Sequence, residues 1–175
     1  SSQKIKGKKN DNDDDDDATS NSSKKLPVHA FRDKIVKFVN HDERKVLIVT
    51  SATGSGKSTQ IPAFFLHHHH HTMAVTQPRR VAAMTLAHRV AQEHEIPVGT
   101  TIGYRVRFDD RTSHQTQLTY VTDGMLLREA MVDPLLKRYS IIFLDEAHER
   151  SLQTDILMGV VHRALQQRSN LNVIV

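Results

Sequence analysis

Two short stretches of this chain carry side chains that could act on a phosphorylated ligand. The first is TGSGKSTQIP at residues 53–62, in which two glycines precede a lysine and a serine. The second is DEAHER at residues 145–150, in which two adjacent carboxylates follow an apolar run. A glycine-rich turn with a lysine can surround phosphate oxygens, and paired carboxylates can hold a hydrated metal ion and accept a proton. These stretches are therefore the first candidates for a functional site.

The glycine-rich stretch fits a nucleotide-binding phosphate loop with one departure. The strict pattern is G-x-x-x-x-G-K-[ST], and Ser51 occupies the position of its first glycine. The apolar run at 46–50 predicts the preceding buried strand, Gly54 and Gly56 predict the turn, and Lys57 can begin a helix whose free N–H groups face an anion. A glycine-rich turn with a chance lysine is the alternative interpretation, and the order of strand, loop and helix argues against it.

The predicted ligand of this loop is ATP or ADP with Mg²⁺. Backbone N–H groups would surround the β-phosphate, Lys57 would reach the β- and γ-phosphate oxygens, and the Ser58 hydroxyl would hold Mg²⁺. The predicted nucleotide-binding residues of the loop are Thr53, Gly54, Ser55, Gly56, Lys57, Ser58 and Thr59.

The carboxylate pair follows the apolar run IIFL at residues 141–144. This run predicts a buried strand that delivers Asp145 and Glu146 to the carboxyl edge of the sheet, where open α/β sheets bind ligands. We expect Asp145 to hold Mg²⁺ through its water shell and Glu146 to take a proton from an attacking water. The alternative is a solvated acidic cluster at a helix start, a role that suits Glu149. The phosphate loop in the same chain weakens this alternative for the pair itself.

Short apolar runs alternate with helical patterns along the chain. This alternation predicts an α/β fold, with a mostly parallel sheet and helices on both of its faces. The predicted strands are Val46–Thr50, Met73–Gln77, Ile102–Arg107, Gln117–Val121, Ser140–Asp145 and Leu171–Val175. The predicted helices are Val28–Asn40, Lys57–Leu66, Arg79–Glu95, Gly124–Met131 and Leu152–Gln167. The last helix has the clearest 3.6-residue period, with one predicted buried face formed by Leu152, Ile156, Leu157, Val160, Val161 and Leu165.

The composition is that of a single globular domain. The chain has 175 residues, of which 38% are hydrophobic, and no apolar run approaches the length of a membrane helix, so we expect no membrane partner. It has no cysteine, which excludes disulfides and thiolate metal sites and is compatible with an intracellular location. The surplus of lysine and arginine gives a net charge of +4, a mild indication of an anionic partner.

Two low-complexity segments stand apart from the predicted domain. Residues 1–25 hold six lysines and six aspartates with few apolar side chains, which predicts a disordered tail and leaves the net charge to residues 26–175. A solvated tail is favoured over a nucleic-acid arm or a nuclear address. Five histidines at 67–71 predict a loop insertion, natural or engineered, and this interpretation is favoured over a metal site.

The letters at 145–148 spell Asp-Glu-Ala-His, and the chain resembles the DEAH-box RNA helicases of superfamily 2. The resemblance covers residues 26–175, and it is closest to the branch that remodels spliceosomes and ribosome precursors. It rests on five segments in the order of the family: TGSGKSTQIP at 53–62, TQPRRVAA at 76–83, GYRVRFDD at 103–110, TDGMLLRE at 122–129 and DEAHERS at 145–151. The family usually has Gly-Glu where this chain has Ser51 and Ala52. The resemblance implies a RecA-like first motor domain that binds ATP.

The resemblance also implies roles that the residues alone leave open. Arg80, Arg107 and Thr122 match positions that contact the backbone of single-stranded RNA, a role that suits guanidinium and hydroxyl groups. Arg89 matches an arginine that stacks on adenine, and His148 matches a residue that couples the nucleotide site to later motifs. Nine residues at about 100° each put Arg80 and Arg89 on nearly opposite faces of a helix, so one patch could not use both.

The family's next motif, Ser-Ala-Thr, would follow directly after Val175. A second RecA-like domain, further carboxy-terminal domains and an activator protein are the partners that the resemblance implies beyond RNA. We expect the chain by itself to bind nucleotide, touch RNA weakly and unwind nothing, whereas the parent would be an ATP-hydrolysing RNA helicase. The location expected for such a parent is intracellular, in the nucleus or nucleolus rather than the cytoplasm. The alternatives are a non-catalytic RNA- or protein-binding module and another nucleic-acid-dependent P-loop ATPase.

Overall fold

The computed structural model describes residues 26–41, 45–52, 54–66 and 71–175. The predicted tail at 1–25, the loop residue Thr53 and the histidines at 67–70 lie outside these ranges. The helices are η1 (Pro27–Phe31), α1 (Arg32–His41), α2 (Lys57–Ala63), α3 (Arg80–Glu93), α4 (Asp123–Val132), η2 (Ala147–Glu149) and α5 (Leu152–Gln167). The strands are β1 (Val46–Leu47), β2 (Met73–Gln77), β3 (Ile102–Val106), β4 (Asp109–Arg111), β5 (Leu118–Thr122), β6 (Ile141–Phe143) and β7 (Asn172–Ile174).

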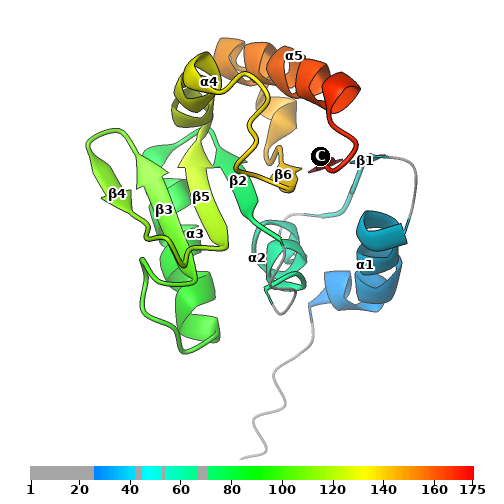
Figure 1. Cartoon of the computed structure of the whole chain (residues 1–175). Helices are drawn as coiled ribbons and strands as arrows, with labels where there is room; N and C mark the ends of the chain where they lie inside the picture. Colours follow the sequence, from blue (N-terminus) through cyan, green and yellow to red (C-terminus); the bar gives the residue numbers. More distant parts are fainter. Residues whose placement is uncertain (1–25, 42–44, 53, 67–70) are drawn as a thin grey trace, which may run out of the picture.

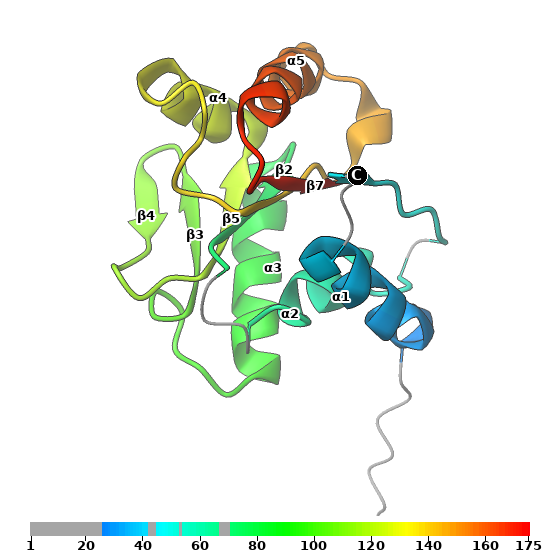
Figure 2. The same ribbon diagram turned by 45° about the vertical axis from the view of Figure 1, so that its right-hand side comes forward.

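The strands form one sheet with the order β1-β7-β6-β2-β5-β3-β4 (Figures 1 and 2). Every pair is parallel except β3 with β4, which is antiparallel. Parallel neighbours need crossover connections, and most of these crossovers contain a helix. Because the strands are parallel, the carboxyl ends of β1, β7, β6, β2, β5 and β3 all lie on one edge of the sheet. The prediction of a mostly parallel α/β fold is confirmed.

Helices cover both faces of the sheet (Figures 1 and 2). One face packs on α1, α2 and α3 through strand residues such as Val75, Tyr120 and Phe143. The other face packs on α4 and α5 through residues such as Ala74 and Ile142. Successive residues of β2 therefore serve opposite layers of the core, as the two-residue period of a strand requires. Burial on both sides explains why the central strands are continuous apolar runs.

The helical pattern of α5 predicted its limits correctly and its buried face in part. Leu152 and Ile156 are 75% and 51% exposed, whereas Leu157 and Val161 are buried as predicted. The buried residues of α5 are Thr154, Leu157, Val161 and Ala164. Thr154 takes a place in the core because its hydroxyl donates to the buried Asp123 carboxylate at 2.6 Å. Val160 and Leu165 are half-buried and pack against the same core, so the observed face includes Thr154 and lacks Leu152 and Ile156.

Two strands also differ from the prediction. The first strand was expected over Val46–Thr50, but the β1 ladder contains only Val46 and Leu47, at the edge of the sheet. β4 was missed because its sequence, Asp-Asp-Arg, is charged and partly exposed, which gives no strand pattern. It forms because the chain turns back at Arg107 and Phe108 and pairs with β3. Among the described residues, none of the helices combines the length and apolar character needed to cross a bilayer.

His71 is the only member of the histidine tract that the described residues include, and it is buried rather than solvated. Its Nδ1 lies 3.2 Å from the Ser140 hydroxyl, and its Nε2 lies 3.2 Å from Asn40 Oδ1. Its ring also packs edge-on against Phe65. This histidine therefore contributes to packing between α1 and the start of β6, and the other four lie outside the described residues.

The turn between β3 and β4 holds Phe108 in a left-handed conformation, with φ of +68°, while 87% of the residue is exposed. A bulky side chain at positive φ costs roughly 1–2 kcal/mol that glycine does not incur. Glycine also loses more chain entropy on folding than phenylalanine does, which offsets part of the relieved strain. We therefore expect Phe108→Gly to raise the free energy of unfolding by a net of about 0.5–1 kcal/mol. Urea unfolding would measure the change. Phe108→Ala is the control, because it removes the ring but keeps the strain, and an equal gain in both variants would contradict the prediction.

Candidate functional site

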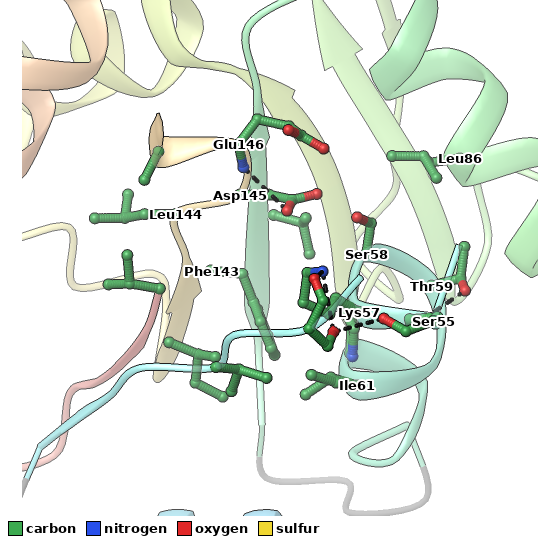
Figure 3. Close-up of a pocket in the computed structure, with 18 of the residues that line it drawn as sticks. Ser55, Lys57, Ser58, Thr59, Ile61, Leu86, Phe143, Leu144, Asp145 and Glu146 are labelled. Atoms are coloured by element: carbon green, nitrogen blue, oxygen red, sulfur yellow. Dashed lines mark hydrogen bonds between the residues drawn. The ribbon is translucent and has the colours of Figure 1, made fainter. Parts of the chain in front are cut away.

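A cleft of about 540 Å³ lies at the carboxyl edge of the sheet, between the glycine-rich loop and the acidic segment (Figure 3). Its floor comes from the ends of β6 and β7, and one wall is the loop with the start of α2. The opposite wall is formed by Asp145, Glu146, Ala147 and His148. The structure therefore brings the two stretches that the sequence singled out to one cavity.

The glycine-rich loop turns through two glycines in the left-handed region, with φ of +79° at Gly54 and +96° at Gly56. A Cβ atom on Gly56 would lie 3.0 Å from Gln60 Cγ and from Leu26 Cδ1, so this position has a second reason to be glycine. A hydrogen bond also links the loop to η1, since the Val28 amide donates to the Ser55 carbonyl at 3.3 Å. The predicted binding residue Thr53 lies outside the described residues.

Lys57 folds back over the loop instead of pointing into solvent. Its ammonium donates to the Ser51 carbonyl at 2.6 Å, to the Ser51 hydroxyl at 3.0 Å and to the Ala52 carbonyl at 3.3 Å. The Ser51 hydroxyl in turn lies 2.6 Å from the Ser55 hydroxyl. Ser51, the departure from the strict loop pattern, is therefore part of the network that holds the lysine at the cleft.

The first turn of α2 carries the two remaining loop residues predicted to bind nucleotide. Ser58 is half-buried and lines the cleft, and its carbonyl accepts a 2.8 Å hydrogen bond from the Tyr120 hydroxyl. Burial raises the pKa of the Tyr120 phenol, with the Asp145 charge adding to the effect, so this tyrosine remains a hydrogen-bond donor. Thr59 also lines the cleft but is buried, and its hydroxyl faces the Gly56 carbonyl at 3.5 Å.

Both carboxylates lie directly beyond β6. Asp145 Oδ2 accepts from the Gln77 side-chain amide at 2.5 Å, and Oδ1 accepts from the Glu146 backbone amide at 3.0 Å. Glu146 itself is exposed and has φ of +52°, an uncommon conformation for a residue other than glycine. The His148 ring lies 3.3 Å from Glu146 Oε2. The sequence did not single out Gln77, because a glutamine at the end of an apolar strand has no local signature of a partner 68 residues away.

The structure divides the four predicted arginine and threonine sites into two groups. Arg89 lines the cleft from α3, where its Nε donates to Glu93 at 3.0 Å. Arg80, Arg107 and Thr122 do not line the cleft. Arg80 and Arg107 follow the carboxyl ends of β2 and β3, and Thr122 is the last residue of β5, in register with Gln77, so all three lie along the same edge of the sheet. Arg80 and Arg107 are exposed, and Thr122 is half-buried.

Asp123 is a buried carboxylate beside this edge. It is 1% exposed, it begins α4, and its Oδ2 accepts from the Thr154 hydroxyl. Burial raises the pKa of Asp123 above its usual value, because the charged form loses its hydration. The hydrogen bond from Thr154 offsets part of this effect.

The raised pKa of Asp123 predicts how the free energy of unfolding depends on pH. A carboxyl with a raised folded-state pKa binds its proton more tightly in the folded protein, so its contribution to stability is lost as the pH rises above the unfolded value of about 3.9. We expect the free energy of unfolding of the natural chain to fall relative to that of Asp123→Asn as the pH rises above about 4. Urea unfolding of both proteins across this range would measure it. A difference that is independent of pH would contradict the prediction.

The residues of the cleft fit a nucleotide with Mg²⁺. The lysine ammonium and the glycine turn offer donors to phosphate, whereas Asp145 and Glu146 offer carboxylate oxygens on the opposite wall. Within the described part of the chain, no group of three or more histidine, aspartate or glutamate side chains could form a metal cage by itself. Mg²⁺ matches this sparse donor set, since it is usually bound by one or two carboxylates together with substrate phosphates and water.

Comparison with known proteins adds sequence similarity to this geometry. No protein-family model matches the chain. The chain is 45% identical over 148 aligned residues to the pre-mRNA-splicing factor ATP-dependent RNA helicase DEAH10 of Arabidopsis thaliana. The alignment covers 82% of this chain and 20% of that protein, so the chain spans about a fifth of the length of this relative.

Proposed function

Because the chain belongs to the DEAH-box helicase family, we propose that it is the ATP-binding, RecA-like first motor domain of an ATP-dependent RNA helicase. The observation that carries the proposal is the cleft in which Lys57 and the glycine turn face the Asp145–Glu146 pair. Two stretches of sequence more than eighty residues apart meet there with the donor and acceptor groups that a magnesium nucleotide requires. A non-catalytic binding module would not need this pairing.

Each group has a proposed role in ATP hydrolysis that its position in the cleft supports. Lys57 would neutralise negative charge on the phosphates, and Ser58 and Asp145 would hold the hydrated Mg²⁺. Glu146 accepts the proton of the attacking water, and His148, 3.3 Å away, orients its carboxylate. Mg²⁺ supplies neutralisation of the charge that develops on the phosphate oxygens. Arg89 lies on the wall of the cleft, where its guanidinium is suited to stack on the adenine ring.

The RNA site that we propose lies beside the nucleotide cleft, on the same edge of the sheet. Arg80, Arg107 and Thr122 would hold the phosphate backbone of single-stranded RNA without reading its sequence. Their separation from the cleft lining allows nucleotide and RNA to bind together. The DEAH-box resemblance adds a second RecA-like domain and an activator protein as partners. The similarity to a pre-mRNA-splicing factor supports a nuclear location for the parent protein.

Calorimetric titration of this chain with ADP, in Mg²⁺ and in EDTA, tests the nucleotide site. We expect saturable binding with one site and tighter binding in Mg²⁺, because Ser58 and Asp145 contribute only when the metal is present. Circular dichroism would establish that the sample is folded. A folded chain that binds ADP under neither condition would remove the ATPase proposal and leave the non-catalytic RNA- or protein-binding module as the better hypothesis.

A further inference from the structure

Gln77, the last residue of β2, is a buried polar side chain that none of the roles above uses. It is 3% exposed, and its Nε2 donates to Asp145 Oδ2 at 2.5 Å. A carboxylate can only accept hydrogen bonds, so the amide nitrogen must be the group that faces it. Because this buried glutamine donates a hydrogen bond to a carboxylate of the cleft, the bond indicates a function for Gln77.

The bond lies where the backbone ladder between two strands stops. The pairing of β2 with β6 ends at Val75 and Phe143, yet β2 continues to Gln77. Beyond Phe143 the chain bends into the acidic segment, in which Glu146 adopts φ of +52°. The Gln77 side chain therefore connects β2 to the start of the acidic segment at Asp145, where β2 and β6 no longer share backbone hydrogen bonds.

The bond also fixes the orientation of the carboxylate. One Asp145 oxygen accepts from Gln77 and the other accepts from the Glu146 amide, so two donors from different elements define the plane of the group. Each carboxylate oxygen keeps a further acceptor site for water. Because an amide is neutral, it orients the carboxylate without cancelling the negative charge, as lysine or arginine would do. The second link between these segments, Arg79 with Glu149 at 3.3 Å, is exposed and hence weak.

We propose that Gln77 is a positioning residue that holds the Asp145 carboxylate in the orientation in which it binds the hydrated Mg²⁺ of the nucleotide. This inference rests on the proposed function. Partners of a metal ligand typically contribute 10–100-fold to metal affinity when they fix its orientation. Gln77 does not line the cleft, so it acts through Asp145 and not through contact with the nucleotide.

The test compares Gln77→Met with the natural chain. Methionine has a similar length and no donor, so it removes the bond while filling most of the space. We expect the ratio of ADP affinities in Mg²⁺ and in EDTA to fall about tenfold, with the affinity in EDTA unchanged. The matched control is Gln92→Met, an exposed glutamine on α3. An unchanged ratio in folded Gln77→Met would overturn the inference, and so would an equal loss with and without Mg²⁺.

A second measurement needs no nucleotide and separates this inference from the proposed function. Hydrogen–deuterium exchange of the free chain reports on the Glu146 amide, which donates to Asp145. If Gln77 positions Asp145, the amides of residues 145–150 exchange faster in Gln77→Met and remain unchanged in Gln92→Met. Unchanged exchange overturns the positioning role, whereas absence of ADP binding by the natural chain overturns the proposed function.

Discussion

Replacing Lys57 with alanine is expected to lower the affinity of the chain for Mg²⁺-ADP by about 100-fold or more. The Lys57 ammonium is held at the mouth of the loop by the carbonyl oxygens of Ser51 and Ala52, 2.6 Å and 3.3 Å away. Hydrogen bonds that involve a charged group contribute about 1.5–3 kcal/mol each, and the ammonium would transfer two of its three N–H groups from the loop oxygens to the phosphates. Alanine offers none, so most of the electrostatic attraction of the loop disappears.

Calorimetry with ADP and Mg²⁺ would measure this loss. Lys137→Ala is the control, because Lys137 is exposed and does not line the cleft. It should leave the affinity unchanged, which separates the effect of Lys57 from that of net charge. Equal affinities for the natural chain and Lys57→Ala would show that the loop does not bind phosphate and that Ser51 marks a real loss of the motif.

Replacing Gly103 with alanine is expected to destabilise the fold by about 3 kcal/mol. A Cβ atom at this position of β3 would overlap the carbonyl oxygen of Arg111 in β4, and it would lie 3.1 Å from Thr112 Cγ2. The obstructing atom belongs to the backbone, so no change of rotamer can relieve the contact. Accommodation requires β4 to separate from β3, which disrupts the pairing of Tyr104 with Arg111.

Thermal and urea unfolding would measure the effect, and the melting temperature should fall by roughly 10 °C for a chain of this size. Gly159→Ala is the matched control. Gly159 lies inside α5, and a Cβ atom there would contact nothing within 4 Å. Alanine should stabilise this helix by about 0.5–1 kcal/mol relative to glycine. If Gly103→Ala and Gly159→Ala changed the free energy of unfolding in the same direction, the inferred close approach of β4 to β3 would be contradicted.

The two predictions show different relations between sequence and structure. The position of Lys57 at the cleft could be predicted from its neighbours, because a strand, a glycine turn and a helix start are all local patterns. The need for glycine at residue 103 could not, because it depends on β4, which is charged and has no apolar alternation. Likewise, the burial of Thr154 on α5 depends on its contact with Asp123, which the spacing of the apolar residues does not reveal.

The sequence by itself determined the class of fold, the limits of the longest helices and the two stretches that line the cleft. These features follow from the period of apolar residues and from turn chemistry, which act over a few residues. Only the tertiary structure decided that Gln77 meets Asp145 and that the Ser51 hydroxyl accepts a hydrogen bond from Lys57. Such contacts depend on strand order and on which side chains share a limited buried volume. Local sequence patterns carry no record of partners that are distant along the chain.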